Sequence, residues 1–338
     1  MKLLIVTDAA PPQINGVVIT LKALAAELER MGHDVHFITP ATFRTMPCPT
    51  YPEIRLSLFP GAGVRRAFEA VVPDAVHIAT EGPLGIAARR HCVRHGLAFT
   101  TSYHTRFPEY VRARIPVPRR LTYAWLRRFH GRAERVMVPT SSIQNELRLR
   151  HFGNTVIWPR GVDLDRFSPS GPVADLAGPA RGGGPVFAYV GRVAVEKNLR
   201  AFLELDLPGT KCVIGGGPQL EQLRREYPCV LFTGPKDHAE LSAYYRAASV
   251  FVFPSRTDTF GLVLLEALAC GVPVAAYPVP GPLDVIGAAG PGVLHADLGS
   301  AARAALAIPR ADARAHAMRY SWEKVARVFL GHLAPLVH

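Results

Sequence analysis

A single carboxylate interrupts an apolar helical segment in the second half of the chain. Residues 255–274 read SRTDTFGLVLLEALACGVPV, in which Glu266 stands among leucine, valine and alanine. An ionised carboxylate is costly to bury without polar partners. Glu266 therefore either accepts hydrogen bonds from a polar ligand, such as the two hydroxyls of a ribose, or forms a structural ion pair with a nearby arginine.

The residues just before this helix offer a second carboxylate and a free helix terminus. Asp258 precedes Glu266 by eight positions, and Thr259, Phe260 and Gly261 open the helix. Backbone N–H groups at a helix N-terminus bind phosphate and other anions. Asp258 can accept hydrogen bonds from sugar hydroxyls, so the segment suits a ligand that carries both phosphates and hydroxyls.

Two cations follow the first strand expected in the second half. In YVGRVAVEKN, Arg192 and Lys197 come after the apolar run. Fixed cations at this position can stabilise a diphosphate that becomes more negative as it departs. Either residue alone would be read as an ordinary solvated surface cation.

A comparable turn opens the first half. In PQINGVV, Asn15 and Gly16 end the loop after the first strand and begin a helix. Glycine lets the backbone approach a phosphate closely, although for this turn alone a plain helix-start glycine is an equally good interpretation. Neither half has Gly-x-Gly-x-x-Gly after its first strand, which argues against a nicotinamide or flavin dinucleotide.

The elements that must position these residues alternate between strands and helices. Apolar runs such as LLIVTD, DVHFITP and DAVHIAT in the first half, and VFAYVGR, KCVIGGG and SVFVFPS in the second, predict an α/β fold with parallel sheets. The Gly/Pro/Ser-rich segment 168–185 is predicted to link a Rossmann-like domain at 1–167 to a second Rossmann-like domain at 186–318. Residues 319–338 should form a terminal helix, which either packs back across the junction or is an ordinary last helix.

The chain length of 338 residues also favours two domains. Two doubly wound units facing one another would leave a cleft at the carboxyl ends of their strands. Five scattered cysteines without a Cys-x-x-Cys pair indicate reduced thiols rather than disulfides or a zinc site. The short N-terminal apolar run does not suit a signal peptide, and no stretch has the roughly 20 apolar residues of a membrane span. We therefore expect a cytoplasmic protein that is at most peripheral on the inner face of the cell membrane.

Positive charge is concentrated in the first half. Residues 1–167 carry 23 lysines and arginines against 13 acidic residues, whereas residues 168–338 carry 16 against 14. Segment 110–135 holds eight arginines with aromatic residues between them and only Glu134 opposing them. Such a segment suits an anionic lipid surface, and the residues predicted to face it are Arg119, Arg120, Trp125, Arg127, Arg128 and Phe129. A solvated basic helix with its aromatic residues in the core is the alternative, and nucleic acid is not expected because no nucleic-acid motif is present.

Taken together in order and spacing, these motifs resemble retaining glycosyltransferases of family 4, which have the GT-B architecture. The resemblance covers nearly the whole chain, and it implies that 1–167 is the acceptor-side domain and 186–318 the nucleotide-sugar-binding domain. Its further motifs are Gly32-His33-Asp34-Val35, Thr101-Ser102-Tyr103-His104-Thr105, Arg160-Gly161-Val162-Asp163, Gly191-Arg192 with Lys197, Gly215-Gly216-Gly217-Pro218 and Thr233-Gly234-Pro235-Lys236.

The resemblance implies a role for each matching residue on the donor side. Gly16 is similar to the loop glycine that contacts the donor, and Arg192 and Lys197 match the pair that binds its diphosphate. Glu266 matches the glutamate that binds the ribose. Asp258 stands where the family usually has another glutamate, one methylene longer.

Further matches concern the sugar and the base. His104 corresponds to the histidine beside the transferred sugar, where it orients the sugar or, less favourably, acts as a general base. Gly217 belongs to the matching glycine-rich turn, and Gly234 to the loop that lines the base pocket.

The resemblance also implies a reaction. A hexose moves from a nucleotide diphosphate sugar with retention, by front-face attack in which the departing phosphate oxygen takes the acceptor's proton. No cofactor and no metal are expected, because Asp163-Leu164-Asp165 is better explained as part of a turn than as a metal motif. GDP-mannose is favoured over UDP-hexoses.

The acceptor side is more open. A membrane lipid such as diacylglycerol or a phosphatidylinositol-type glycolipid is the favoured acceptor. The alternatives are the same chemistry on a soluble sugar or polysaccharide, and a non-catalytic α/β protein that binds nucleotides or nucleic acid.

Overall fold

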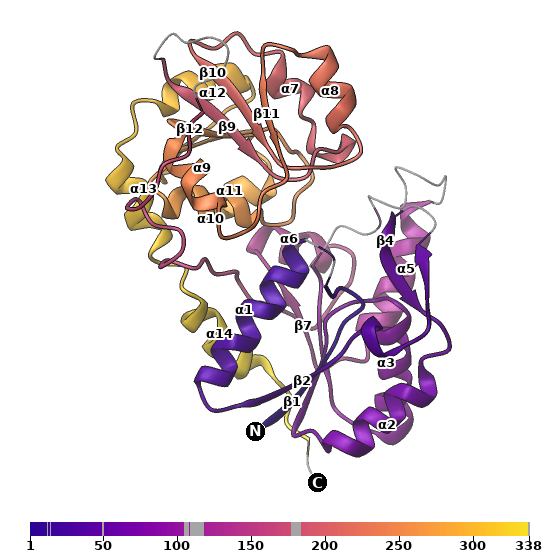
Figure 1. Ribbon diagram of the computed structural model, residues 1–338. Coiled ribbons are helices and arrows are strands. Elements are labelled where there is room, and N and C mark those ends of the chain that lie inside the picture. Colours follow the sequence, from indigo (N-terminus) through magenta and orange to yellow (C-terminus); the bar gives the residue numbers. More distant parts are fainter. Residues whose placement is uncertain are drawn as a thin grey trace. The chain divides into compact units, whose positions relative to one another are not determined.

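The computed structural model describes residues 1–11, 13, 15–48, 51–104, 108, 118–176 and 184–336. The chain forms two compact units: unit 1 comprises Met1–Arg160 with Trp322–His338, and unit 2 comprises Gly161–Ser321. The division after Arg160 thus precedes the linker expected at 168–185, of which 177–183 lies outside the described residues. Figure 1 shows the elements of each unit.

Unit 1 is built on a parallel sheet. Within the described part of the chain this sheet has six strands in the order β2-β1-β5-β6-β7-β8, and β3 and β4 form a separate antiparallel pair. The strands are β1 (Lys2–Val6), β2 (Asp34–Ile38), β3 (Thr45–Cys48), β4 (Tyr51–Ser57), β5 (Ala75–Ile78), β6 (Thr100–Ser102), β7 (Arg135–Val138) and β8 (Thr155–Ile157). The helices are α1 (Gly16–Arg30), η1 (Pro40–Thr42), α2 (Gly61–Val71), α3 (Pro83–His95), α5 (Arg119–His130), α6 (Ser141–Arg148) and α14 (Trp322–His332).

Unit 2 repeats this plan. Its parallel sheet has, among the described residues, six strands in the order β11-β10-β9-β12-β13-β14. The strands are β9 (Val186–Val190), β10 (Thr210–Ile214), β11 (Leu231–Gly234), β12 (Val250–Phe253), β13 (Val274–Ala276) and β14 (Gly292–Leu294). The helices are η2 (Val195–Lys197), α7 (Arg200–Leu203), α8 (Leu220–Glu226), α9 (Leu241–Ala247), α10 (Leu262–Ala269), α11 (Pro280–Ile286), α12 (Leu298–Ala305) and α13 (Arg310–Ala317).

Continuous apolar strands follow from burial of both faces of each sheet. In β12, Phe251 and Phe253 pack in one core cluster with α9, α10 and α13, whereas Val250 and Val252 pack in another with α7, α8 and α12. Successive side chains of a strand point to opposite faces, so a strand covered on both sides needs apolar residues at every position. The predicted α/β fold with two doubly wound parallel sheets is confirmed.

The strand order reverses next to the first strand of each sheet. In unit 2 the chain runs outward from β9 through β10 to β11, and then continues on the other side of β9 with β12. In unit 1 the reversal lies between β1 and β5. Ligands of open α/β sheets bind outside the carboxyl ends of the strands at such a reversal, so the residues that follow β9 and β12, and β1 and β5, are the ones to inspect.

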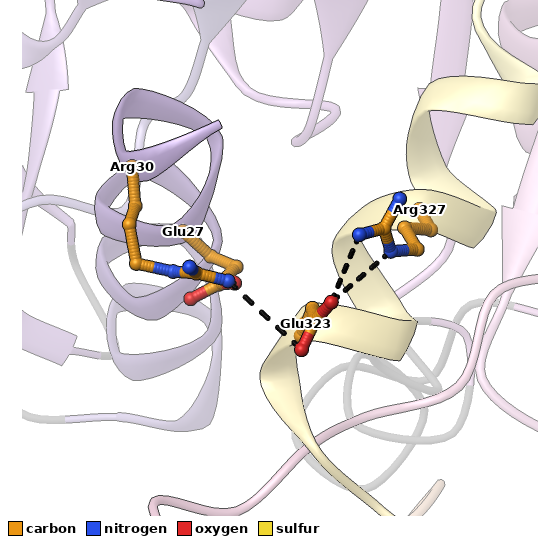
Figure 2. A network of polar contacts seen from close by, with 4 residues as sticks. All are labelled: Glu27, Arg30, Glu323 and Arg327. Carbon is orange, nitrogen blue, oxygen red and sulfur yellow. Dashed lines mark hydrogen bonds and ion pairs between the residues drawn. The ribbon is translucent and has the colours of Figure 1, made fainter. Parts of the chain in front are cut away.

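The terminal helix α14 belongs to unit 1. Its Phe329 is fully buried, the Trp158 indole N–H donates to the Val325 carbonyl oxygen at 3.2 Å, and Arg135 donates to the Gly331 carbonyl oxygen at 2.8 Å. On the surface, Arg30 of α1 approaches Glu323 of α14 at 3.9 Å, as Figure 2 shows. These surface side chains are largely exposed, and such ion pairs contribute little, so the buried contacts hold α14 in place.

How the two units are arranged is a separate matter from their folds. The predicted facing arrangement, with a cleft between the units, stays a prediction. Within the described residues, every helix falls short of the length and apolar character that crossing a membrane would require.

Candidate functional site

The residues after β9 and β12 meet at the strand-order reversal of unit 2. Arg192 follows β9 after Gly191, and the Tyr189 hydroxyl donates to its carbonyl oxygen at 2.9 Å. Lys197 lies at the end of η2, and its Nζ donates to Oδ1 of Asp258 at 2.6 Å. The structure thus brings two of the predicted catalytic residues, Lys197 and Asp258, into direct contact.

One carboxylate oxygen of Asp258 has no hydrogen-bond donor among the described residues. Its Oδ2 is buried and, among the described residues, accepts no hydrogen bond, although Oδ1 is engaged by Lys197. A buried acceptor without a donor is costly and calls for an explanation. A ligand hydroxyl would supply the missing donor. The carboxylate therefore pairs with a cation through one oxygen and has an unfilled acceptor at the other.

Glu266 lies in the second turn of α10 and is 5 % exposed. Its Oε2 accepts from the Tyr245 hydroxyl at 2.8 Å, and its Oε1 lies 3.4 Å from Nε2 of His238. Arg166 donates to Nδ1 of the same imidazole at 2.8 Å. The carboxylate therefore has polar partners, but they are a tyrosine and a histidine rather than the arginine considered in the sequence analysis. Arg166 reaches Glu266 only through His238.

Tyr245 and His238 were missed by sequence reasoning. Burial, followed by the charge of Glu266, raises the pKa of Tyr245 well above its ordinary value, so the phenol stays protonated and donates. Both residues precede Glu266 by more than twenty positions, on α9 and the loop before it. No spacing in the sequence signals that contact, because it is created by the packing of α9 on α10.

The donor-side turns depend on backbone conformations that suit glycine. Gly217 has φ +154°, and a Cβ there would lie 2.4 Å from the Val193 carbonyl oxygen. Gly261 has φ +83° and precedes α10 without a side-chain cap. Gly234 ends β11, and the ring of Phe260 is buried in the core, so Phe260 can offer only its backbone to a ligand. Thr259 is half-buried before this turn.

In unit 1, Asn15 and Gly16 begin α1. The Asn15 side-chain oxygen accepts from the N–H groups of Val17 and Val18, each at 3.0 Å. This is an N-cap. Gly16 is the first helical residue and is exposed. The cap fixes where α1 starts and leaves the glycine backbone accessible.

His104 follows β6, and its ring is held by a buried guanidinium. Arg160 lies 3.1 Å from the imidazole Nδ1 through its Nη2, and stacks on Trp158 at 4.3 Å. A guanidinium only donates, so Nδ1 accepts and the imidazole hydrogen is assigned to Nε2. Burial, then the charges of Arg160 and His77, lower the pKa of His104 well below its ordinary value. His104 is therefore neutral and suited to donating a hydrogen bond through Nε2 rather than to accepting a proton.

Arg160 is itself unusual. It is 4 % exposed, donates to the Trp158 carbonyl oxygen at 2.7 Å, and burial lowers its pKa to about 9. Sequence analysis placed it in a family motif but assigned it no role. Its contact with His104 spans 56 positions, and the strand order β6-β7-β8 brings the residues that follow β6 and β8 to the same edge of the sheet.

A carboxylate at the equivalent edge of unit 1 is occupied internally. Asp8, which follows β1, accepts from Thr80 at 2.9 Å, from the Leu84 N–H at 3.0 Å and from the Gly85 N–H at 3.4 Å. Burial raises its pKa in spite of these bonds. Asp8 therefore serves the N-terminus of α3, and it is not equivalent to Asp258.

The predicted membrane-facing residues lie on α5. Arg119, Arg120, Arg127 and Arg128 are exposed, and Trp125 is 38 % exposed. Phe129 is 4 % exposed and packs in the core of unit 1, as the solvated-helix alternative had its aromatic residues do. Tyr110, Arg112, Arg114 and Thr105 lie outside the described residues.

The Asp163-Leu164-Asp165 segment forms a turn. Asp163 accepts from the Arg166 N–H through Oδ1 at 2.9 Å, and its carbonyl oxygen accepts from the Phe167 N–H at 2.9 Å. The side chain thus stabilises the local backbone, as the sequence had suggested for this segment.

Comparison with known proteins places these observations in context. Residues 14–166 match the family model described as Glycosyltransferase Family 4, and residues 177–317 match the model described as Glycosyl transferases group 1. The chain is 30 % identical over 307 residues to a GDP-mannose-dependent alpha-mannosyltransferase of Mycobacterium tuberculosis, covering 85 % of this chain and 81 % of that protein. It is 28 % identical over 321 residues to the alpha-monoglucosyldiacylglycerol synthase of Acholeplasma laidlawii, covering 81 % of this chain and 79 % of that protein.

Solved structures agree on the fold. Sucrose-phosphate synthase from Thermosynechococcus elongatus superposes with a TM-score of 0.76 at 23 % identity, covering 98 % of this chain and 97 % of that one. At this level of identity the likeness concerns the two-domain α/β fold alone.

Proposed function

Because the chain belongs to glycosyltransferase family 4, has the GT-B fold class and is a hexosyltransferase, we propose that it transfers mannose from GDP-mannose to a membrane lipid with retention at the anomeric carbon. The donor is suggested by relatives whose names specify GDP-mannose. The acceptor is suggested by relatives named alpha-monoglucosyldiacylglycerol synthase and by the basic helix α5.

The pair formed by Lys197 and Asp258 is the observation that carries this proposal. Nζ of Lys197 has three N–H donors, so it can keep its 2.6 Å bond to Asp258 and still donate to a phosphate oxygen. The buried Oδ2 of Asp258 can then accept a hydroxyl of the sugar attached to that phosphate. The pair of Lys197 and Asp258 would thereby contact the phosphate on one side of the breaking bond and the sugar on the other.

The reaction proceeds by exchange of one bond for another. The bond between the anomeric carbon and the β-phosphate oxygen breaks, and the acceptor oxygen forms a bond to that carbon from the same face. The acceptor proton moves to the departing phosphate oxygen. Lys197 and Arg192 stabilise the negative charge on the nucleoside diphosphate, and Glu266 holds the ribose.

His104 contributes without exchanging a proton. Arg160 holds the imidazole through Nδ1, so the hydrogen on Nε2 is the one that would be directed at an oxygen of the transferred sugar. The low pKa of this imidazole makes it a poor proton acceptor at neutral pH. We therefore assign His104 to orienting the sugar.

A donor panel tests the nucleotide and the sugar. The melting temperature of the chain is measured with GDP-mannose, UDP-glucose and ADP-glucose at equal concentrations. A bound donor stabilises the native state in proportion to the logarithm of its concentration over Kd, and we expect the largest increase with GDP-mannose. A larger increase with a UDP-sugar would overturn the proposed donor while leaving the glycosyltransferase assignment intact.

A product assay tests the acceptor and the stereochemistry. Radiolabelled donor is incubated with vesicles containing diacylglycerol or phosphatidylinositol, and the organic phase is separated from the aqueous phase. Label in the organic phase, with an α-anomeric proton signal, supports the proposal. Label transferred only to a soluble sugar or polysaccharide would favour the second candidate acceptor.

A further inference from the structure

Two helices of unit 1 combine their arginines on one surface. Arg89, Val93, Arg127, Arg128, Gly131 and Arg132 line a groove of about 380 Å³, which we name the arginine groove. A second hollow, of about 200 Å³, adjoins it and is lined by Ile86, Arg89, Arg90, Trp125, Arg128 and Phe129. Arg89 and Arg128 line both. The surface therefore spans α3 and α5, two neighbouring helices of unit 1 (Figure 1).

Arg89 ties the two helices together. Its Nε donates to the Phe129 carbonyl oxygen and its Nη2 to the Arg128 carbonyl oxygen, both at 2.8 Å. These carbonyls end α5, where a cation is favoured by the helix dipole. Because both bonds hold Arg89 against the end of α5, the other guanidinium groups of the groove lie around a side chain that is fixed in place.

Within the part of the chain that the structure describes, no carboxylate neutralises the charges of the groove. Among the described residues, none of Arg89, Arg90, Arg127, Arg128 and Arg132 forms an ion pair with a carboxylate. Arg127 donates to the Arg150 carbonyl oxygen at 3.3 Å. Burial, and then the charges of Arg128, Arg132 and Arg90, lower the pKa of Arg89. Like charges held this closely repel one another, so an anion from outside would relieve them.

Apolar side chains border the same surface. Trp125 stacks on Phe129 with ring centroids 6.0 Å apart and is 38 % exposed, and Val93 is 44 % exposed. Leu121, one helical turn before Trp125 on α5, is 57 % exposed. Aromatic rings beside basic residues are typical of surfaces that lie at the headgroup level of a bilayer. A soluble anion would not require this apolar border.

We propose that the arginine groove binds the phosphate of an anionic lipid headgroup, with Trp125 and Leu121 entering the interface beside it. Guanidinium groups suit this task because they donate to phosphate oxygens in a planar fork. The groove volume is within the range of about 300–1,000 Å³ that ligand sites occupy, so it can take one headgroup. The inference rests on the proposed lipid acceptor as the reason for meeting a membrane, and it adds a discrete lipid site that includes α3.

Vesicle binding by matched variants tests the groove. Flotation is measured with phosphatidylcholine vesicles, with and without phosphatidylglycerol, for the full chain, for R128Q/R132Q and for R119Q/R120Q. Both double variants lose two charges from the same region, but Arg119 and Arg120 do not line the groove. Diffuse attraction predicts equal losses, about fivefold per basic residue. A discrete site predicts a loss at least about tenfold larger for R128Q/R132Q, and equal losses would overturn it.

Three further arms fix the source of the phosphate and keep the test independent of folding. The lipid assignment would be overturned if glycerol 1-phosphate raised the melting temperature while vesicles failed to bind. It would also be overturned if an oligonucleotide bound more tightly than vesicles. Brominated lipids should quench the fluorescence of Trp125, and this quenching should be absent in W125F. Protein that binds vesicles without such quenching would show that another face docks. R128K/R132K, which keeps both charges, should recover part of the binding, whereas a variant that merely fails to fold would not be recovered.

Failure of this inference is separable from failure of the proposed function. Flotation contains no donor and requires no turnover. A chain that binds through the groove but makes no lipid product overturns the proposed acceptor alone. If the parent chain glycosylates lipid in detergent, but R128Q/R132Q floats as well as the parent chain, only the groove is overturned.

Discussion

The two units have similar sheets but differ in the charged side chains that lie at the carboxyl ends of their strands. In unit 2, acids and bases are paired: Lys197 with Asp258 at 2.6 Å, and His238 with Glu266 at 3.4 Å. In unit 1, the corresponding edge holds Arg160 against a neutral imidazole, with no carboxylate contact to Arg160 in the described residues. Asp8, the nearby acid of unit 1, is occupied by α3.

This difference supports the proposed division of the substrate between the two units. Paired charges with a spare carboxylate oxygen can hold a ligand that has both phosphates and hydroxyls, without any one charge being left buried alone. Neutral imidazoles stabilised by a buried cation can orient hydroxyls but exchange protons poorly. Under the proposed function, the charge of the leaving group would therefore be stabilised by unit 2.

Removal of Lys197 should have the largest effect. We expect K197A to lower turnover about 10²- to 10³-fold, because it removes a fixed cation at the departing diphosphate and leaves Asp258 without its counter-ion. R225A, an exposed change on α8, should stay within about twofold. Initial rates at saturating donor measure both. Equal turnover of K197A and the parent chain would contradict the assignment of leaving-group charge to unit 2.

Two substitutions of Asp258 separate the charge of its side chain from its length. D258N keeps the shape but removes the charge that pairs with Lys197 and weakens acceptance by the free oxygen, and we expect about a 10- to 100-fold loss of kcat/KM. D258E restores the longer arm found in the resembling family and should retain more activity than D258N. If D258N were the more active of the two, the carboxylate charge would not be the property that matters.

Sequence reasoning reached the fold and the local motifs but not the long-range contacts. The strand–helix alternation sufficed for two parallel sheets, because burial of both faces demands continuous apolar strands such as Val250–Phe253. It also led to Lys197 and Asp258, which lie beside the strand-order reversal. Tyr245, His238 and the pairing of Arg160 with His104 were not predictable, since these contacts join separate elements and leave no periodic signal.

Unit 1 should depend on pH through His77. This residue is 1 % exposed, its nitrogens lie 2.9 Å from Thr100 Oγ1 and 2.7 Å from Ser102 Oγ, and burial lowers its pKa from 6.5 to about 3. Below about pH 6.5 the unfolded chain binds a proton that the folded chain does not, so stability falls as the pH drops towards 3. Between pH 7 and pH 5 we expect a loss of about 2 kcal/mol from this residue.

Tryptophan fluorescence can isolate that effect. All three tryptophans belong to unit 1, so urea unfolding followed by their emission reports unit 1 alone. H77Q retains hydrogen-bonding groups for Thr100 and Ser102 but cannot be protonated. Its free energy of unfolding should change less than that of the parent chain between pH 7 and pH 5. An identical pH dependence would show that His77 is not the titrating group and would weaken the contrast between the units.

The smallest expected effect concerns the Tyr245 hydroxyl. Y245F removes the donor to Oε2 of Glu266 and leaves the ring in place, so the carboxylate loses one of the contacts that orient it. A single hydrogen bond contributes about 1 kcal/mol net, which corresponds to about a fivefold rise in the Kd for GDP-mannose, measured by titration calorimetry. Y227F is the matched control, because Tyr227 also donates to a glutamate, Glu204, but on an exposed surface. An equal change in both variants would mean that Tyr245 does not position Glu266, and the acid would then owe its orientation to His238 and Arg166.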